Sequence, residues 1–234
     1  LVSLAAEDSR VLAITAAMAQ GTGLSGFAKA YPDRFFDVGI AEEHAMTLAA
    51  GMAAGGMRPV FAVYATFLQR ACDQLLQEVC LENLPVTVLV YHAGFVPGDG
   101  ETHQGVYDLA SLRAMPGLVV WSPCDAEELD AMIRAAVKLD GPCVIRYPEA
   151  LPEALGVPTP LGTWREILPG KDIPLAGHGH SLETALEAAE LLKEQGISAG
   201  VYGATTMHVM DDEAMRRLQK ENLVVAVEEG AVQG

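Results

Sequence analysis

The sequence predicts an α/β fold in which a mostly parallel six-stranded sheet carries helices on both faces and is followed by a second, truncated α/β domain. Two observations lead to this prediction. Six short apolar runs rich in β-branched residues alternate with segments of helix length, and the same alternation restarts after residue 170. In addition, half of the 234 residues are hydrophobic and 23 are glycines, a composition typical of compact α/β proteins with small packing residues.

The predicted strands of the first sheet are short and apolar. They are VLAIT (11–15), RFFDV (34–38), PVFAV (59–63), VTVLVY (86–91), LVVWS (118–122) and CVIRY (143–147). Apolar residues recur at spacings of four and seven from Leu68 to Cys80, which predicts a helix after the third strand. Another helix is predicted after the fifth strand, with either Ser122 or Asp125 as its cap.

Residues 1–150 are predicted to form the first domain. The segment 151–170 is rich in proline and has no regular period, as is typical of an extended linker. Over 171–234, two predicted strands flank a helix with Ser181 as its N-cap and Gly196 as its C-cap, and a further helix and strand follow. Because the last strand would leave a sheet edge unpaired, we expect the chain to be a piece of a larger fold.

The excess of acidic residues bears on which molecules the protein can bind. With 31 acidic against 15 basic residues the formal net charge is −16, which disfavours nucleic acid and membranes as partners, because phosphate groups attract a basic surface. The four cysteines lack CxxC spacing and predict buried, reduced thiols. Neither a signal peptide nor an apolar run of about 20 residues is present, so we expect a cytoplasmic protein that acts on small molecules.

Polar clusters follow three of the predicted strands. They are GIAEEHAM (39–46), YATFLQR (64–70) and HAGFVPGDGETHQG (92–105). Ligands bind at the carboxyl ends of strands in parallel α/β sheets, so the three clusters are expected to share one rim. None matches the phosphate-binding patterns GxxxxGKS or GxGxxG. In the third cluster Asp99 and His103, four residues apart, are candidates for substrate contacts.

Each cluster by itself also has a structural explanation. Glu42 and Glu43 suit the positive end of a helix dipole, and Asp99 with the following glycine is ordinary turn chemistry. His44 is also compatible with a packed structural histidine, and Phe67 with a core residue. Their co-occurrence at the ends of neighbouring strands is what favours a functional site.

These segments also resemble a known family. The matching stretches are FFDVGIAEEHAMTLAAGMAAGGMRPVFAVYATFLQRACDQL, HAGFVPGDGETHQGVYDLASLRAMPGLVVWSPCDAEEL and GPCVIRYP. In order and nearly without gaps, they resemble the pyrimidine-binding domain of the 1-deoxy-D-xylulose-5-phosphate synthase family within the transketolase superfamily. The resemblance covers about residues 1–150, and residues 171–234 resemble the first part of that family's C-terminal domain.

The resemblance implies thiamine-diphosphate chemistry at the rim. By motif match, Glu42 resembles the catalytic carboxylate that hydrogen-bonds N1′ of the cofactor's aminopyrimidine, which requires a carboxyl that is protonated or shares its proton with the ring. Phe67 resembles the aromatic residue that stacks on the pyrimidine. Tyr64 resembles a second wall of that pocket, and Arg70 a polar clamp near the same ring.

The resemblance further implies the reaction. The family decarboxylates pyruvate and adds the two-carbon unit to an aldose phosphate such as glyceraldehyde 3-phosphate, in the supply of isoprenoid precursors. Asp99 and His103 resemble residues that handle the substrate, and His103 is also expected to be catalytic. At two places where the family carries arginines for the acceptor's phosphate, this chain has His92 and Glu149, so His92 is a substrate candidate and the acceptor is open.

A partner is implied as well. The family's diphosphate-binding domain, with its metal ligands, is absent from these residues, so no metal site is predicted here and Mg²⁺ is expected to be held by that domain. The implied assembly is a homo-oligomer or a complex with a subunit that carries it. Two alternatives are a transketolase-type C-terminal subunit that transfers ketol groups between sugar phosphates, and a degenerate, non-catalytic assembly module.

Overall fold

The first sheet contains all six predicted strands. The computed structural model describes residues 1–155 and 160–231. Within the sheet the order is β2-β1-β3-β4-β6-β5, and every neighbouring pair is parallel. The strands are β1 (Val11–Thr15), β2 (Phe35–Asp37), β3 (Arg58–Tyr64), β4 (Thr87–Tyr91), β5 (Val119–Trp121) and β6 (Cys143–Arg146). The predicted parallel α/β sheet is therefore confirmed.

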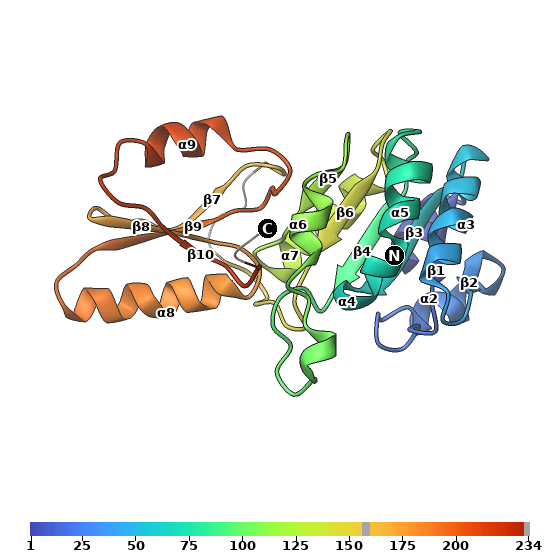
Figure 1. The fold of residues 1–234 in the computed structure, drawn as a ribbon, viewed down its shortest axis with the longest axis horizontal. Coiled ribbons are helices and arrows are strands. Elements are labelled where there is room, and N and C mark those ends of the chain that lie inside the picture. Colours follow the sequence, from blue (N-terminus) through green and yellow to red (C-terminus); the bar gives the residue numbers. More distant parts are fainter. Residues whose placement is uncertain (156–159, 232–234) are drawn as a thin grey trace.

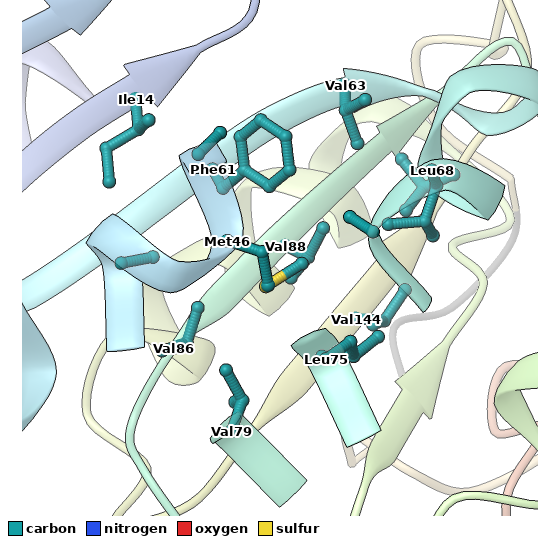
Figure 2. Packing of buried hydrophobic residues seen from close by; sticks show 14 of the residues in the cluster. Ile14, Met46, Phe61, Val63, Leu68, Leu75, Val79, Val86, Val88 and Val144 are labelled. Carbon is teal, nitrogen blue, oxygen red and sulfur yellow. The ribbon is translucent and has the colours of Figure 1, made fainter. Parts of the chain in front are cut away.

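Helices cover both faces of this sheet (Figure 1). They are α1 (Val2–Glu7), α2 (Ser25–Ala30), α3 (Glu42–Ala54), α4 (Ala65–Leu68), α5 (Cys72–Gln74), α6 (Asp108–Leu112) and α7 (Ala126–Ala136). Successive residues of a strand face opposite sides, so Ile14 of β1 belongs to one core and Ala13 to the other. In the first core, shown in Figure 2, Met46 of α3 packs with Phe61 and Val88.

The helix predicted from Leu68 to Cys80 is present but interrupted. After α4 the chain forms a 3-10 turn, η2 (Gln69–Ala71), then α5, then a π-helical segment, η3 (Leu75–Cys80). Leu75 and Val79 still face the core as the apolar spacing predicts. The changes of helix type concern backbone hydrogen bonds, which the spacing of apolar side chains does not reveal. Further 3-10 turns are η1 (Pro32–Arg34) and η4 (Glu101–His103).

The second sheet is smaller and mixed, and it lies beside the first along the long axis of the molecule (Figure 1). Its order is β10-β8-β9-β7, with β7 antiparallel to β9 and the other pairs parallel. Its elements are β7 (Arg165–Leu168), β8 (Ile173–Gly177), α8 (Ser181–Glu194), β9 (Ala199–Gly203), α9 (Asp212–Leu218) and β10 (Val225–Val227). The strands and helices predicted after residue 170 are present.

Two details of this region differ from the expectation. The segment 151–170, of which 156–159 lie outside the described residues, contains β7, a strand too short to show a period and paired with the much later β9. Ser181 is the first residue of α8 and not its cap. Its hydroxyl is engaged one turn earlier, where it accepts from the N–H of His178 (3.0 Å) and donates to the carbonyl of the same residue (2.7 Å).

Helix α7 is tied to the second domain through its cap. Asp125, one of the two predicted caps, accepts from the N–H of Glu128 (2.8 Å) with one carboxylate oxygen. Its other oxygen accepts from the guanidinium of Arg165 in β7 (2.8 Å). Ser122, the other predicted cap, instead donates its backbone N–H to the carbonyl of Thr205 (2.9 Å). The edge strand β5 is thereby covered by the chain that follows β9.

A second buried network joins the two sheets. Arg146, the last residue of β6, donates to both carboxylate oxygens of Asp108 (2.9 and 3.2 Å). The same guanidinium lies 2.9 Å from Nδ1 of His178, which follows β8. Burial and then the charge of Arg146 lower the pKa of His178 to about 3, so the imidazole is neutral and accepts from the arginine.

Candidate active site

The three polar clusters meet at the carboxyl edge of the first sheet. GIAEEHAM follows β2 and opens α3, YATFLQR follows β3, and HAGFVPGDGETHQG follows β4. Direct contacts join them: the guanidinium of Arg70 lies 3.4 Å from the carboxylate of Glu42, and the rings of Tyr64 and His92 are 4.5 Å apart. The expected shared rim is therefore present.

Glu42 is the buried charged residue of the GIAEEHAM cluster. It is the first residue of α3 and its side chain is 2% exposed, whereas Glu43 and His44 face solvent. The turn before the helix is held by Asp37, whose carboxylate accepts from the N–H of Gly39 (3.0 Å). The positive end of a helix dipole attracts a carboxylate whether it is exposed or buried. The dipole therefore explains an acidic residue such as Glu43 at this position, but it does not explain why Glu42 is buried.

Aromatic rings line the rim next to this carboxylate. Tyr64 and Phe67 are nearly parallel, with ring centroids 6.0 Å apart and an interplanar angle of 12°. The ring of His103 meets Phe67 edge-on at 5.4 Å. Since Phe67 precedes the turn that carries Arg70, the carboxylate of Glu42, the Phe67 ring and the His103 imidazole lie around one region of the rim.

The loop 92–105 is fixed by Gln104, which sequence reasoning did not single out. The side-chain oxygen of Gln104 accepts from the N–H of Val96 (2.8 Å), and its amide nitrogen donates to the carbonyls of Asp99 (3.2 Å) and Gly100 (3.1 Å). In the sequence, only the position of Gln104 next to His103 could have drawn attention to it. A side-chain amide that binds backbone groups belongs to no motif with a fixed spacing.

Gly105 allows this loop to close against the strands. A Cβ atom there would lie 2.3 Å from the carbonyl oxygen of His92 and 2.7 Å from the Cβ of Ala65. The glycine also exchanges two backbone hydrogen bonds of 2.8 Å with Gly94. A larger side chain at this position would displace His92 from the rim.

The two predicted substrate residues of the loop occupy different places. The carboxylate of Asp99 lies 3.9 Å from Nδ1 of His92 and is partly exposed. His103 instead faces Phe67, and the hydroxyl of Thr102 lies 3.0 Å from its Nδ1. The rim thus offers two separate polar positions, one beside Phe67 and one beside Tyr64.

Among the described residues, no group of three or more His, Cys, Asp or Glu side chains is arranged to hold a metal ion. The four cysteines are free thiols, and burial raises the pKa of Cys80 to about 11. No described helix is both long and apolar enough to cross a lipid bilayer.

The residue types present are those that a planar nitrogen heterocycle needs. It would require an aromatic face to stack on and a carboxyl at its edge, and Phe67 of α4 and Glu42 of α3, which is joined to the turn after α4 through Arg70, are side chains of these two kinds. The burial of Glu42 excludes water from such a hydrogen bond.

Comparison with known families decides the assignment of the fold. Residues 1–153 match the family model described as the transketolase pyrimidine-binding domain, which is well over half of the chain. The chain belongs to the transketolase family. Residues 162–234 match the model of the transketolase C-terminal domain. The resemblance that the sequence motifs indicate is therefore confirmed.

Transketolase relatives agree in sequence and in fold. The 1-deoxy-D-xylulose-5-phosphate synthases of Symbiobacterium thermophilum and Aquifex aeolicus are 50% and 46% identical over the whole chain. The chain spans 37% and 38% of their lengths. A solved structure described as a split gene transketolase, "inactive beta4 tetramer", is 32% identical with a TM-score of 0.88, and this chain covers 78% of it. A Pichia stipitis transketolase, 22% identical, shares the fold with a TM-score of 0.84.

Proposed function

We propose that this chain supplies the pyrimidine-binding half of a thiamine-diphosphate-dependent transferase of the 1-deoxy-D-xylulose-5-phosphate synthase type. In this reaction the bond between the carboxylate and the carbonyl carbon of pyruvate breaks and CO₂ leaves. The former carbonyl carbon then forms a bond to the aldehyde carbon of an aldose acceptor, whose oxygen takes up a proton. With glyceraldehyde 3-phosphate as acceptor, the product is the isoprenoid precursor 1-deoxyxylulose 5-phosphate.

The observation that carries this proposal is the buried carboxyl of Glu42 beside Arg70 and near the stacked ring of Phe67. Thiamine diphosphate, when bound, supplies the electron sink that pyruvate needs in order to lose CO₂. In the proposal Glu42 holds a proton against the ring nitrogen of the pyrimidine, and Phe67 and Tyr64 form the walls. Arg70, which is 56% exposed, orients the carboxyl from the solvent side.

The substrate is proposed to lie over the same rim. In the proposal His103 exchanges a proton with a substrate oxygen through Nε2, and the contact of Thr102 with Nδ1 supports this assignment of the two ring nitrogens. Asp99 and His92 are proposed to contact the acceptor at the Tyr64 side.

We further propose that the diphosphate and its Mg²⁺ are held by a diphosphate-binding domain outside these residues, in a homo-oligomer or a partner subunit. The length of the relatives supports this, since the chain aligns with little more than a third of each. The described residues also contain no metal-binding cluster. We expect no turnover from the chain without that domain. The cytoplasmic location expected from the sequence is part of the same proposal.

The proposal is tested by pyruvate-dependent CO₂ release from the assembled enzyme, in which this chain is combined with the diphosphate-binding domain, thiamine diphosphate and Mg²⁺. CO₂ release that stops when thiamine diphosphate is omitted is the expected result. A transketolase-type subunit, which the split-gene relative favours as the alternative, would release no CO₂ but would transfer a ketol group from a ketose phosphate. Inactivity with both donors would indicate a non-catalytic assembly module.

A further inference from the structure

A compact group of aromatic and acidic side chains lies at the carboxyl ends of β3, β4 and β6. We call it the acidic rim, and its members are Tyr64, Tyr91, His92, Asp99 and Glu149. The His92 ring lies 4.1 Å from the Tyr91 ring and 4.5 Å from the Tyr64 ring. The two tyrosine rings meet edge-on at 5.5 Å. These contacts form a wall of rings that begins at Tyr64, the proposed wall of the pyrimidine pocket, and extends towards the end of β6.

His92 is held in this wall by an unusual backbone conformation. Its φ is +57°, a left-handed value that costs a non-glycine residue free energy and that persists only where the surroundings impose it. Its Nδ1 atom is buried and has no hydrogen-bond partner among the described residues. The nearest opposite charge is the Asp99 carboxylate at 3.9 Å, which is beyond hydrogen-bond distance. The His92 imidazole therefore carries an unsatisfied buried nitrogen within this wall of rings.

Glu149 approaches the same wall from β6. The N–H of Tyr147 donates to the carbonyl of Val90 (2.9 Å), and the N–H of Ala93 donates to the carbonyl of Tyr147 (3.1 Å). The chain two residues later is therefore beside the start of the loop that carries His92. Glu149 is exposed, and the negative charge of its carboxylate adds to the effect of burial in raising the pKa of the Tyr91 phenol.

The charge of the acidic rim is negative. Burial raises the pKa of the Tyr64 phenol, and the carboxylates of Asp99 and Glu149 raise it further. Two arginines lie at the same edge of the sheet, and each is already engaged with a carboxylate: Arg70 with Glu42 and Arg146 with Asp108. Arg146 is buried and already uses its forked N–H donors on both oxygens of Asp108, so it offers no such pair to a phosphate monoester.

We propose that the acidic rim binds the acceptor of the reaction proposed above and favours an uncharged polyhydroxy aldehyde over a phosphorylated one. Hydroxyl groups of such an acceptor donate to Asp99 and Glu149, and its C–H faces pack on the tyrosine rings. A phosphate dianion at the same place meets two like charges, which disfavour its binding. The proposal thus refines the acceptor within the proposed function and rests on it.

The test compares D-glyceraldehyde with D-glyceraldehyde 3-phosphate as acceptors for the assembled enzyme with pyruvate. We expect the wild type to use glyceraldehyde with a kcat/KM at least equal to that for the phosphate ester. The double variant His92→Arg with Glu149→Arg should raise kcat/KM for the phosphate ester about tenfold or more, because two guanidinium groups replace a histidine and a carboxylate. Its kcat/KM for glyceraldehyde should not rise.

The matched control is Glu153→Arg, which makes the same charge change as Glu149→Arg alone at an exposed position near the start of α7. The neighbouring carbonyl of Pro152 accepts from the N–H of Ala126 (2.9 Å), which ties this segment to the start of α7, after the edge strand β5. The control should leave the ratio of the two acceptors unchanged. A wild type that strongly prefers the phosphate ester, or a double variant with the wild-type ratio, would overturn the proposal.

A binding measurement separates this proposal from the proposed function. Calorimetric titration with inorganic phosphate should show no binding to the wild type and measurable binding to the double variant, with circular dichroism as the check of folding. Phosphate binding to the wild type would overturn the acidic-rim proposal even if CO₂ is released. Absence of CO₂ release would overturn the proposed function, while the phosphate titration would still decide the charge preference of the rim.

Discussion

At the residue scale, Glu42 and Glu43 are adjacent, identical in type and opposite in environment. Glu42 is buried beside Arg70, and Glu43 is exposed to solvent. Successive residues of an α-helix project about 100° apart, so only one of the two can face the sheet edge. In the described structure the buried carboxyl of Glu42 pairs with the guanidinium of Arg70.

We predict that Glu42→Gln lowers pyruvate-dependent CO₂ release by the assembled enzyme about 100-fold or more, because the amide keeps the side-chain volume but cannot transfer the proton. The melting temperature should change little, since the partner Arg70 is more than half exposed and the ion pair adds little stability. Glu43→Gln is the matched control and should retain activity. Activity of Glu42→Gln comparable to wild type would contradict the assignment.

At the element scale, Asp125 both caps α7 and links this helix to β7. Asp125 caps the helix through Glu128 and also accepts from Arg165 of β7, with both charged side chains nearly fully buried. The N–H of Leu155 donates to the same carboxylate (2.8 Å). The start of α7 is therefore fixed to the chain that enters the second sheet.

We predict that Asp125→Ala lowers the free energy of unfolding by about 3 kcal/mol or more, because it removes one carboxylate of a buried ion pair together with the cap. Asp125→Asn keeps an oxygen that can accept from the helix N–H, so its loss should be smaller by about 1 kcal/mol, the typical worth of a cap. Denaturant-induced unfolding measures both changes. Wild-type stability of the alanine variant would show that the network carries no stability.

At the scale of the whole molecule, the two sheets are joined by polar groups that are buried together. Arg146 of the first sheet bonds Asp108 and reaches His178 of the second, whose Nε2 atom has no partner in the described structure. Such a junction is stable only while the imidazole is neutral, since a second positive charge beside the guanidinium would be repelled.

This junction predicts that stability depends on pH. The pKa of His178 is lowered from an ordinary 6.5 to about 3 in the folded chain, so between these values the unfolded chain binds a proton that the folded chain does not. Stability should therefore fall as the pH falls from about 6.5 towards 3. His178→Gln should show a smaller decrease in melting temperature between pH 7 and pH 5 than the wild type. His180→Gln, at an exposed position nearby, should retain the wild-type decrease.

The sequence by itself determined the six strands of the first domain, their parallel arrangement and the three clusters at the edge of that sheet. Apolar runs and helical spacing are local properties, and parallel strands bring their carboxyl ends to one edge whatever their order. The motifs also pointed to Glu42, Phe67 and His103 before their contacts were known. The roles of these residues remain predictions.

Only the tertiary structure decided which of these side chains meet. The burial of Glu42, the left-handed backbone of His92, the bonds of Gln104 and the pairing of β7 with β9 each depend on segments distant in the sequence. Contacts between distant segments have no period and no fixed spacing, so they appear only when the chain is folded and the sheets are packed together.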